Sequence, residues 1–379
     1  MYFDESPKSS RADFFDFEEQ LQKLEEWIKA GARLTKITGL RRTGKTSLLL
    51  TALNEAKLPY ILLDGRVFSP SPSISRSELI QIMERSLNDF LIREEGWRER
   101  VLRWLKGLRG IEVSVSPPSI SLRWGAPWKD AADLPGIFES LGKAAEESGQ
   151  RLVLVLDEAQ EFRKIAGYDL TRILAHVYDY VKGIQVIVTG SQMGFLYEFL
   201  GEDNPASPLF GRPMPEIKMT RLDREKALEF LKEGFRQIGI APDARLLEEA
   251  VEKVDGIIGW LTYLGVQAKY AGKLDAQILE SAFEKGARLS AQELEHFLSS
   301  HPQARGRYLE ILKIVAKGEG MRWSEIKTSL EARERKSIAD NVFNGLLQNL
   351  VKSGLVCKKD ENYFISDPLL LQALRTGVV

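Results

Sequence analysis

The chain of 379 residues contains a single cysteine, Cys357, and only three histidines. One cysteine excludes an intramolecular disulfide and a thiolate metal cluster, which fits a reducing compartment. No segment approaches the run of about 20 apolar residues that a membrane-spanning helix requires. The opening stretch MYFDESPKSSRADFF carries acidic residues where a secretion signal needs a basic and then an apolar run. We therefore expect a cytoplasmic protein that does not contact a membrane.

The sequence also lacks a charge excess of either sign. Lys and Arg total 53 against 54 for Asp and Glu, so no field of the whole molecule attracts nucleic acid or membrane, and any such binding must be local. Apolar residues make up 44% and charged residues 28%, which is ordinary for a folded protein. The length exceeds what one hydrophobic core usually serves and predicts two or three domains.

Four short apolar runs alternate with helical patterns through the first two hundred residues. They are RLTKITG, LPYILLDG, RLVLVLDEAQ and IQVIVTGSQ. Because these runs are apolar throughout rather than at every second residue, they predict parallel strands covered by helices on both faces. The fold class expected is therefore α/β, a three-layer parallel-sheet core.

Other patterns divide the rest of the chain. A polar helix over about 76–108 and a β-hairpin around Pro117 and Pro118, within 110–125, are expected as an insertion in a core of residues 1–215. Strands are expected to stop after SPLFGRPMPEI, and a helical domain over 216–300 follows, interrupted at Gly256 and Gly259. Residues 301–379 are expected to form three helices and two short strands, a winged helix-turn-helix.

The segment GLRRTGKT, from Gly39 to Thr46, fits the pattern G-x-x-x-x-G-K-[ST] between a predicted strand and a predicted helix. Average composition gives such a match by chance in roughly one chain in a hundred of this size. Backbone N–H groups of this turn and of the helix start converge on a phosphate chain, Lys45 supplies a cation to its end, and Thr46 can coordinate Mg²⁺. The phosphate-contacting residues expected are Gly39, Leu40, Arg41, Arg42, Thr43, Gly44, Lys45, Thr46 and Ser47. For the two arginines, exposure to solvent is the stronger alternative.

A second acidic motif completes the expected chemistry. Asp157 follows five apolar residues at the carboxyl end of a strand, where open α/β sheets bind ligands, and Glu158 comes next. We expect Asp157 to orient the Mg²⁺ shell and Glu158 to orient and deprotonate the attacking water. The alternative for Asp157 is a helix N-cap.

Two further positions are candidates at the same edge. The strand IQVIVTGS ends at Thr189, Gly190 and Ser191, and either hydroxyl is placed to sense the terminal phosphate or to cap the next helix. Arg212, in SPLFGR near a domain junction, is suited to neutralising charge in the transition state, with a salt bridge as the competing account.

Together these motifs resemble the archaeal ATPase family within the STAND class of AAA+ P-loop NTPases. The resemblance rests on FFDFEEQLQKL, GLRRTGKT, LVLVLDEAQEF, IVTGSQMGFL and SPLFGR in this order, followed by a helical lid and a winged helix. It implies the strand order 5-1-4-3-2, ATP or ADP bound with Mg²⁺ between core and lid, and a winged helix whose position depends on the nucleotide. It also implies slow hydrolysis of ATP to ADP and phosphate.

The chain departs from the family at two positions near the expected adenine site. Relatives commonly carry an arginine where Phe17 stands in FFDFEE, and a proline where Ile258 stands in DGIIGW. Phe14 and Phe15 are carried over as a wall near the base, with plain core packing as the alternative.

The third domain leaves two partners open. Residues 305–379 contain 13 Lys and Arg against 9 Asp and Glu. Arg333, Arg335 and Lys336 before the helix at about Ile338, with Lys358 and Lys359 on the wing, are placed to meet the phosphates of double-stranded DNA. Winged helices also dock proteins. The rival functions are accordingly an ATP-regulated DNA-binding protein related to archaeal replication initiators, and a signalling scaffold with a structural nucleotide. The sequence does not fix the oligomeric state.

Overall fold

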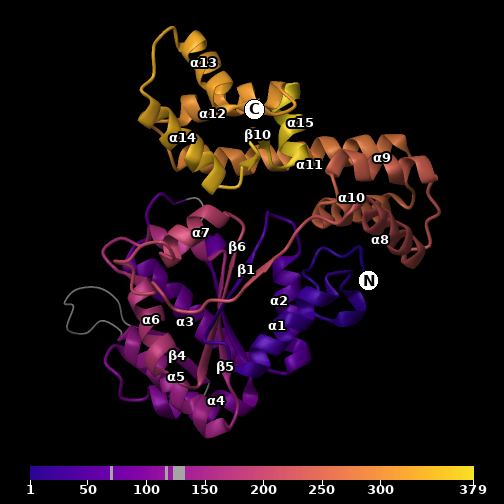
Figure 1. Cartoon of the computed structure of the whole chain (residues 1–379). Coiled ribbons are helices and arrows are strands. Elements are labelled where there is room, and N and C mark those ends of the chain that lie inside the picture. The colour runs from indigo at the N-terminus through magenta and orange to yellow at the C-terminus, as the bar shows by residue number, and fades with distance from the viewer. Residues whose placement is uncertain (69–70, 116–117, 123–132) are drawn as a thin grey trace.

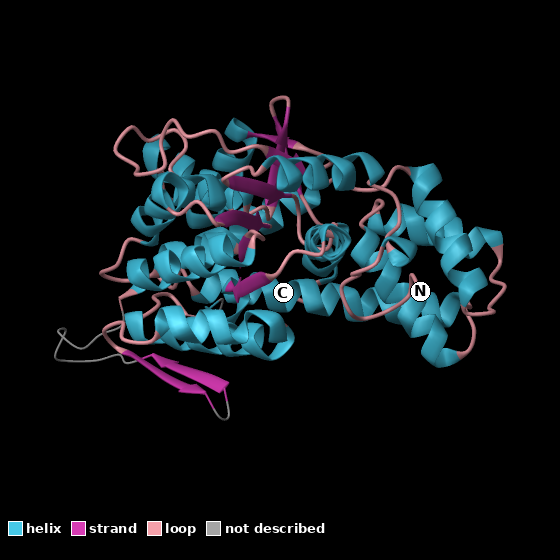
Figure 2. Cartoon of the chain, turned by 90° about the horizontal axis from the view of Figure 1, so that it is seen from below, coloured by secondary structure: helices cyan, strands magenta, loops and turns pink. Residues whose placement is uncertain are grey.

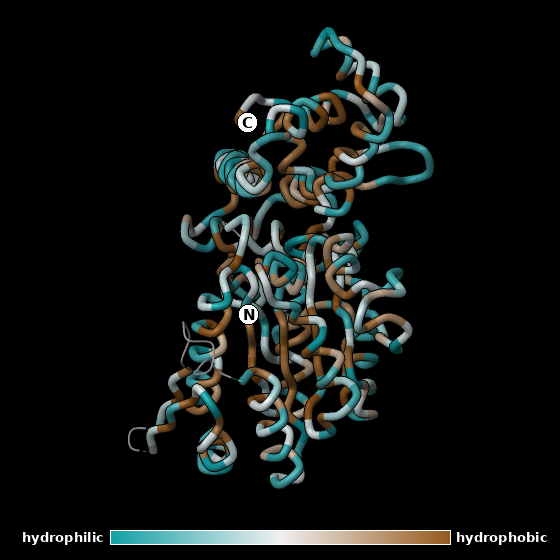
Figure 3. Tube along the Cα trace, turned by 90° about the vertical axis from the view of Figure 1, so that its left-hand side faces the viewer, coloured by the Kyte–Doolittle hydropathy of each residue, from teal (hydrophilic) through white to brown (hydrophobic). Residues whose placement is uncertain are grey.

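A computed structural model describes residues 1–68, 71–115, 118–122 and 133–379. A parallel sheet with helices on both faces forms the core, and four helices lie beside the carboxyl edge of that sheet (Figure 1). The C-terminal helices and a small sheet lie above the core in the same view. Hydrophobic residues concentrate along the strands, and polar residues along the outer loops (Figure 3).

The central sheet has five parallel strands in the order β2-β5-β6-β1-β7. Numbered along the chain within this sheet, the order is 2-3-4-1-5, which confirms the order 5-1-4-3-2 when traced from the other edge. The strands are β1 (Leu34–Thr38), β2 (Tyr60–Asp64), β5 (Leu152–Asp157), β6 (Ile184–Gly190) and β7 (Glu216–Lys218).

Every residue of β5 and β6 is buried, because both faces of the sheet are covered. Leu152, Leu154 and Leu156 belong to one hydrophobic cluster, whereas Val153 and Val155 belong to another. The alternation of strand side chains thus supplies two cores, and the three-layer fold class is confirmed. The covering helices are α1 (Glu18–Ala30), α2 (Lys45–Ala56), α3 (Arg76–Arg93), α5 (Leu134–Ser148), α6 (Leu170–Tyr180) and α7 (Met193–Leu200).

The expected insertion is present, with a break in its helix. The pattern over 76–108 forms α3 and then α4 (Glu95–Leu105), because the chain leaves helical geometry at Glu94. The hairpin pairs β3 (Ile111–Val115) with β4 (Pro118–Leu122), in register from Ile111 opposite Leu122 to Val115 opposite Pro118. It projects from the body of the molecule in Figure 2. The last residues of the expected insertion lie outside the described ranges.

A fifth strand, which the four apolar runs did not include, lies at the end of SPLFGRPMPEI. β7 pairs with β1 through Lys36, Ile37 and Thr38, so the sheet continues to Lys218. Its three residues are too few for a periodic signal, and pairing with β1 fixes them as strand. The domain boundaries themselves remain predictions.

Four helices follow β7: α8 (Arg224–Gln237), α9 (Ala244–Val254), α10 (Ile258–Ala271) and α11 (Ala276–Ser299). The chain turns at Gly256, as expected, whereas Gly259 lies inside α10. The amino-terminal segment packs here, because Phe3 is fully buried among Phe230 and Phe235 of α8. This segment therefore joins core and helical lid.

The C-terminal part has the expected winged helix-turn-helix, with two additional elements. The three expected helices are present, and β8 joins the two wing strands in an antiparallel sheet of order β8-β10-β9. A final helix, α15, packs against α11. The elements are α12 (Arg305–Lys317), β8 (Met321–Arg322), α13 (Trp323–Glu334), α14 (Asp340–Lys352), β9 (Val356–Lys359), β10 (Asn362–Ile365) and α15 (Pro368–Thr376).

The winged helix lies directly against the core. Lys352 at the end of α14 forms an ion pair of 3.1 Å with Glu198 of α7. Leu294 and Leu298 of α11 belong to the hydrophobic cluster of the winged helix, so this helix is shared between the lid and the last domain. Among the helices of the described residues, none is long and apolar enough to cross a bilayer.

Candidate functional site

The turn between β1 and α2 forms the centre of the site. Gly39 and Gly44 adopt positive φ angles of 148° and 90°, which the chain needs in order to turn from strand into helix. Among the described residues, no hydrogen-bond acceptor is found for the backbone N–H groups of residues 42–47. Unpaired N–H groups at a helix start attract an anion, since the helix dipole adds to them.

Lys45 lies inside this turn and is only 5% exposed. Its Nζ donates to the carbonyl oxygens of Gly39 at 3.0 Å and Leu40 at 2.8 Å. Burial lowers the pKa of this ammonium, although the nearby Glu158 and Asp157 oppose the shift. An anion in the turn would therefore compensate a cation that is costly to bury.

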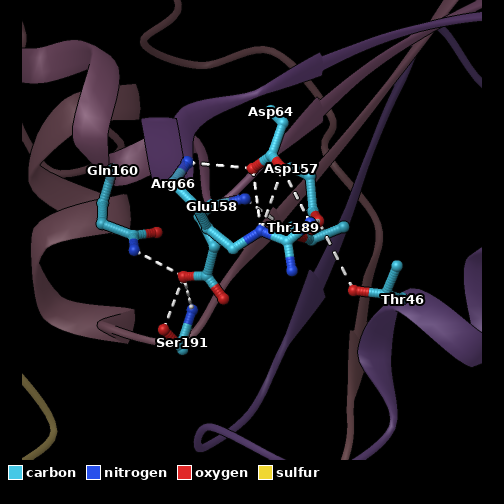
Figure 4. Close-up of polar contacts among 8 residues, drawn as sticks. All are labelled: Thr46, Asp64, Arg66, Asp157, Glu158, Gln160, Thr189 and Ser191. Carbon is cyan, nitrogen blue, oxygen red and sulfur yellow. Dashed lines mark hydrogen bonds and ion pairs between the residues drawn. The ribbon is translucent and has the colours of Figure 1, made fainter. Parts of the chain in front are cut away.

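Thr46 and Asp157 approach each other from α2 and β5. The Thr46 hydroxyl lies 3.4 Å from Oδ2 of Asp157 (Figure 4). Burial raises the pKa of Asp157, and the hydrogen bond from Thr189 lowers it only partly. A hydroxyl and a carboxylate oxygen are ligands that Mg²⁺ prefers, and a bound cation would relieve the burial of this carboxylate. The pair fits the expected metal.

Thr189 and Ser191, which the sequence left as equal candidates, lie in different positions. The fully buried Thr189 hydroxyl donates to Oδ1 of Asp157 and accepts the backbone N–H of Glu158 at 3.1 Å. It thus connects both acidic residues to β6. Neither residue accepts a hydrogen bond from an N–H of the following helix, among the bonds between described residues.

Ser191 instead holds Glu158. Oε2 of Glu158 accepts the Ser191 N–H at 3.0 Å, the Ser191 hydroxyl, and Nε2 of Gln160 at 2.6 Å. Burial alone would raise the pKa of Glu158, but Lys45 and these donors together hold it below its usual value. The carboxylate is therefore ionised near neutral pH, and its orientation is fixed.

The two arginines of the turn form ion pairs within the chain, while their side chains stay 37% (Arg41) and 23% (Arg42) exposed. The guanidinium of Arg42 donates to both oxygens of Glu293 in α11, at 2.5 and 3.0 Å, and that of Arg41 lies 3.2 Å from the same carboxylate. Arg42 also stacks on Trp260 of α10, 3.9 Å from the ring centroid. Gly259 donates its N–H to the Arg42 carbonyl at 2.9 Å. Residues of the lid therefore contact the turn directly.

A cavity of about 740 Å³ opens beside the turn, within the size range of small-molecule sites. Its walls come from the amino-terminal segment, the turn, the residues that follow β5, and α10. Both departures from the family pattern, Phe17 and Ile258, lie in the wall, as do the Phe14 and Phe15 carried over as neighbours of a base. The wall thus contains both aromatic side chains and charged groups. The contacts of an adenine with them remain a prediction.

Arg212 lies elsewhere. Its guanidinium pairs with Asp179 of α6, with Nη2 at 2.6 Å and Nε at 3.0 Å, and it is absent from the cavity wall. The salt bridge is the arrangement within this chain, so any contact of Arg212 with a phosphate would require a change or a second copy. Its catalytic role stays a prediction.

Several residues of the site were missed in the sequence. Asp64 is the last residue of β2 and Arg66 follows the strand, so the rule that ligands gather at the carboxyl ends of parallel strands would have found them. Glu293 carries no such signal, since it lies 251 residues from Arg42 within a regular helix. Trp260 was not predicted either, because it lies in an apolar helix whose pattern indicates core packing alone.

Models of two known families match this chain, one over the sheet core and most of the lid, the other over the winged helix. A model for an ATPase domain predominantly from Archaea matches residues 14–264, and a model for the C-terminal winged helix-turn-helix domain of MCM protein matches residues 302–366. A search of curated proteins found no match.

Solved structures extend the likeness to the whole chain. A Walker-type ATPase of Pyrococcus abyssi is 33% identical, with a TM-score of 0.81 over 99% of this chain and 100% of that chain. The ORC2 protein of Aeropyrum pernix, in ADPNP–ADP complexes, is 17% identical, with a TM-score of 0.62 over 100% of this chain and 96% of that chain. At this lower identity the second likeness concerns the fold alone.

The buried hydroxyl of Thr189 generates a paired test. Thr189→Val keeps the shape but leaves the Glu158 N–H without an acceptor, so the free energy of unfolding should fall by about 1–3 kcal/mol. The control is Thr51→Val: the hydroxyl of Thr51 is fully buried in α2 without a hydrogen-bond partner among the described residues. That change should leave stability unchanged or raise it. Urea unfolding measures both, and equal effects would contradict the role of Thr189.

Proposed function

The chain belongs to the family of ATPase domains found predominantly in Archaea, and from this we propose that it is a Mg²⁺-dependent ATP switch. In this proposal ATP bound at the turn after β1 is hydrolysed slowly to ADP and phosphate. The nucleotide state controls the position of the winged helix relative to the core. The proposal refines the STAND-like function expected from the sequence.

Binding is supported by the buried Lys45 and by the N–H groups of residues 42–47, which have no acceptor within the part of the chain that the structure describes. Lys45 would exchange its two carbonyl partners for phosphate oxygens. Thr46 and Asp157 would hold Mg²⁺, which supplies neutralisation of the charge that develops on the transferring phosphoryl group. The aromatic residues of the cavity wall, among them Phe14, Phe15 and Phe230, would receive the base.

Hydrolysis is supported by the state of Glu158. Its carboxylate is ionised, as a general base must be, and is oriented by Ser191 and Gln160. In the proposed reaction Glu158 accepts a proton from the attacking water, while Lys45 stays on the phosphates. Thr189 keeps Glu158 and Asp157 in register.

The observation that carries the switch is the continuous set of contacts from the turn to the winged helix. Arg42 pairs with Glu293 and stacks on Trp260, and the indole N–H of Trp260 lies 3.1 Å from Oδ2 of Asp367. Asp367 in turn caps the amino terminus of α15, accepting the N–H of Leu369 at 2.8 Å. A phosphate that attracts the Arg42 guanidinium would weaken its bond to Glu293 and release this set of contacts.

The winged helix also reaches the site from the other side. The turn after α14 lies so close to β6 that a Cβ on Gly354 would stand 3.2 Å from the carbonyl oxygen of Ser191, the residue that holds Glu158. A change at the terminal phosphate would therefore act on this domain through Ser191 as well as through Glu293.

Two substitutions separate binding from turnover. Lys45→Ala should lower ATP affinity on the order of 100-fold, because a charge-assisted contact to phosphate is lost. Glu158→Gln should keep the affinity and lower turnover by about 10²–10⁴-fold, because only the base is lost. Calorimetric titration with ATP and Mg²⁺ and a phosphate-release assay measure the two effects.

The control for charge alone is Lys232→Ala, at an exposed position of α8. It should leave both measurements unchanged. Equal ATP titrations for the wild type and Lys45→Ala would overturn the assignment of the site.

The switch is tested by Glu293→Gln. The change removes a partly exposed ion-pair partner of Arg41 and Arg42, so the affinity for a non-hydrolysable ATP analogue should rise about 5-fold, corresponding to ~1 kcal/mol.

A distance measurement tests the movement itself. The chain has one cysteine, so Cys357→Ser removes the native labelling site. Spin labels are then attached at Lys29→Cys on α1 and at Lys359→Cys on the wing.

The distance between these labels should change when the wild type binds the ATP analogue, and Glu293→Gln should show part of that change without nucleotide. Glu295→Gln is the matched control, since Glu295 lies on the same helix but pairs with Arg305. Identical distances in all nucleotide states would contradict the switch.

DNA binding is the second candidate function. It is supported by the exposed start of α14, with Asn341, Val342 and Asn344, and by the basic bias of the last domain. The other end of α14 lies on α7, and Arg333 is paired with Glu310. Access of a duplex to the whole helix would require the winged helix to leave the core.

We therefore expect duplex binding only with the ATP analogue, weakening with salt by a slope of about 0.9 per phosphate contacted. Fluorescence polarisation with a random duplex across a salt series, with Lys336→Glu as the variant, measures it. An absence of binding at low salt in every nucleotide state would leave a protein as the partner of this domain.

A further inference from the structure

An arginine outside all motifs of the sequence lines the cavity beside the turn. Arg66 belongs to the short 3-10 helix Gly65–Phe68 that follows β2. It lines the same cavity as Lys45, Thr46 and Glu158. Figure 4 shows it beside Asp64 and Asp157.

The backbone brings Arg66 to this place by close packing. Asp64 pairs in register with Asp157 across the two neighbouring parallel strands. Between Asp64 and Arg66 stands Gly65, where a Cβ would lie 2.6 Å from the carbonyl oxygen of Glu158 and 2.9 Å from that of Asp157. Only glycine lets the chain pass so close to the acidic motif, and the next residue is therefore held beside it.

Asp64 then fixes the direction of the side chain. Nε of Arg66 donates to Oδ1 of Asp64 at 2.8 Å and Nη2 donates to Oδ2 at 2.7 Å, and the backbone N–H of Arg66 donates to the same Oδ1 at 2.9 Å. A two-point contact between a guanidinium and a carboxylate sets the plane of the cation. The Asp64 hydrogen bonds raise the pKa of Arg66 further, so it stays charged.

The cation lies next to the expected metal ligands Thr46 and Asp157. Nη2 of Arg66 lies 3.7 Å from Oδ2 of Asp157, the oxygen that lies 3.4 Å from the Thr46 hydroxyl. The side chain is nevertheless 59% exposed, so a ligand in the cavity can reach it. Arg212, the arginine expected from the sequence to neutralise the transition state, is absent from this cavity.

We propose that Arg66, oriented by Asp64, binds the terminal phosphate of ATP and stabilises the charge that develops there during hydrolysis. The inference rests on the proposed ATP site and adds to it a cation supplied by β2 of the same chain. Because ADP lacks the terminal phosphate, Arg66 also distinguishes ATP from ADP.

The test compares affinities as well as rates. With Mg²⁺ present, Arg66→Ala should weaken binding of a non-hydrolysable ATP analogue by ~10–100-fold and change ADP affinity by less than about 2-fold. Turnover should fall by about 10³-fold or more, as for other arginines that contact the transferring group. Arg66→Lys should restore part of the affinity for the analogue but little turnover, since lysine lacks the planar fork.

Two further variants separate orientation from simple charge. Asp64→Asn leaves the cation in place without its two-point partner, so turnover should fall while the preference for the ATP analogue over ADP persists in part. Arg236→Ala is the matched control: Arg236 forms a comparable two-point pair with Glu233 on α8, away from the cavity. It should change neither affinity nor turnover.

The outcomes distinguish this inference from the function beneath it. If the wild type binds neither nucleotide, the proposed function fails. If the wild type prefers the ATP analogue and Arg66→Ala keeps that preference and the turnover, the role of Arg66 is overturned. If Arg66→Ala lowers the affinities for the ATP analogue and for ADP equally, the role of Arg66 is also overturned. Such a result would indicate a structural effect on the whole site, which does not distinguish the two nucleotides.

Discussion

The concentration of positive charge at the turn after β1 is the constraint on which the rest of the structure depends. Unpaired N–H groups, Lys45, Arg41 and Arg42 converge there, and without an anion each cation needs a carboxylate. Glu158 of the sheet lies near Lys45, and Glu293 of the lid pairs with both arginines. Asp64 plays the same part for Arg66. Core and lid are thus held together by charges that a phosphate chain would redistribute.

The sheet makes this arrangement rigid where chemistry requires it. The two hydrophobic clusters on its faces fix β5 and β6, and Thr189 connects their ends through Asp157 and the backbone of Glu158. One of these clusters continues into the lid, where it includes Phe230, Trp260 and Leu261. At the turn itself the lid adds polar contacts, through Glu293 and the N–H of Gly259. These polar contacts carry small, reversible free energies, which a change of nucleotide can outweigh.

The sequence predicted whatever depends on local pattern. Continuous apolar runs gave the parallel strands, the glycine-rich turn gave the anion site, and helical periods gave the winged helix. β7 escaped because three residues carry no period, and pairing with β1 decides their conformation. The ion pair between Arg42 and Glu293 was not predicted, because the two residues lie 251 positions apart in the sequence. Arg66 was accessible in principle, since it follows a strand end, but no motif drew attention to it.

Helix α11 contacts both the turn after β1 and the winged helix. Glu293 contacts the turn, and its neighbour Leu294 is buried in the hydrophobic cluster of the winged helix. Only the width of α11 thus separates the turn from the winged helix. This helix has 24 residues and is about 36 Å long. A tilt of about ten degrees around one end would carry the other through about 6 Å. In the proposed switch, a shift of α11 at Glu293 therefore moves the adjacent Leu294, and with it the winged helix, in the same step.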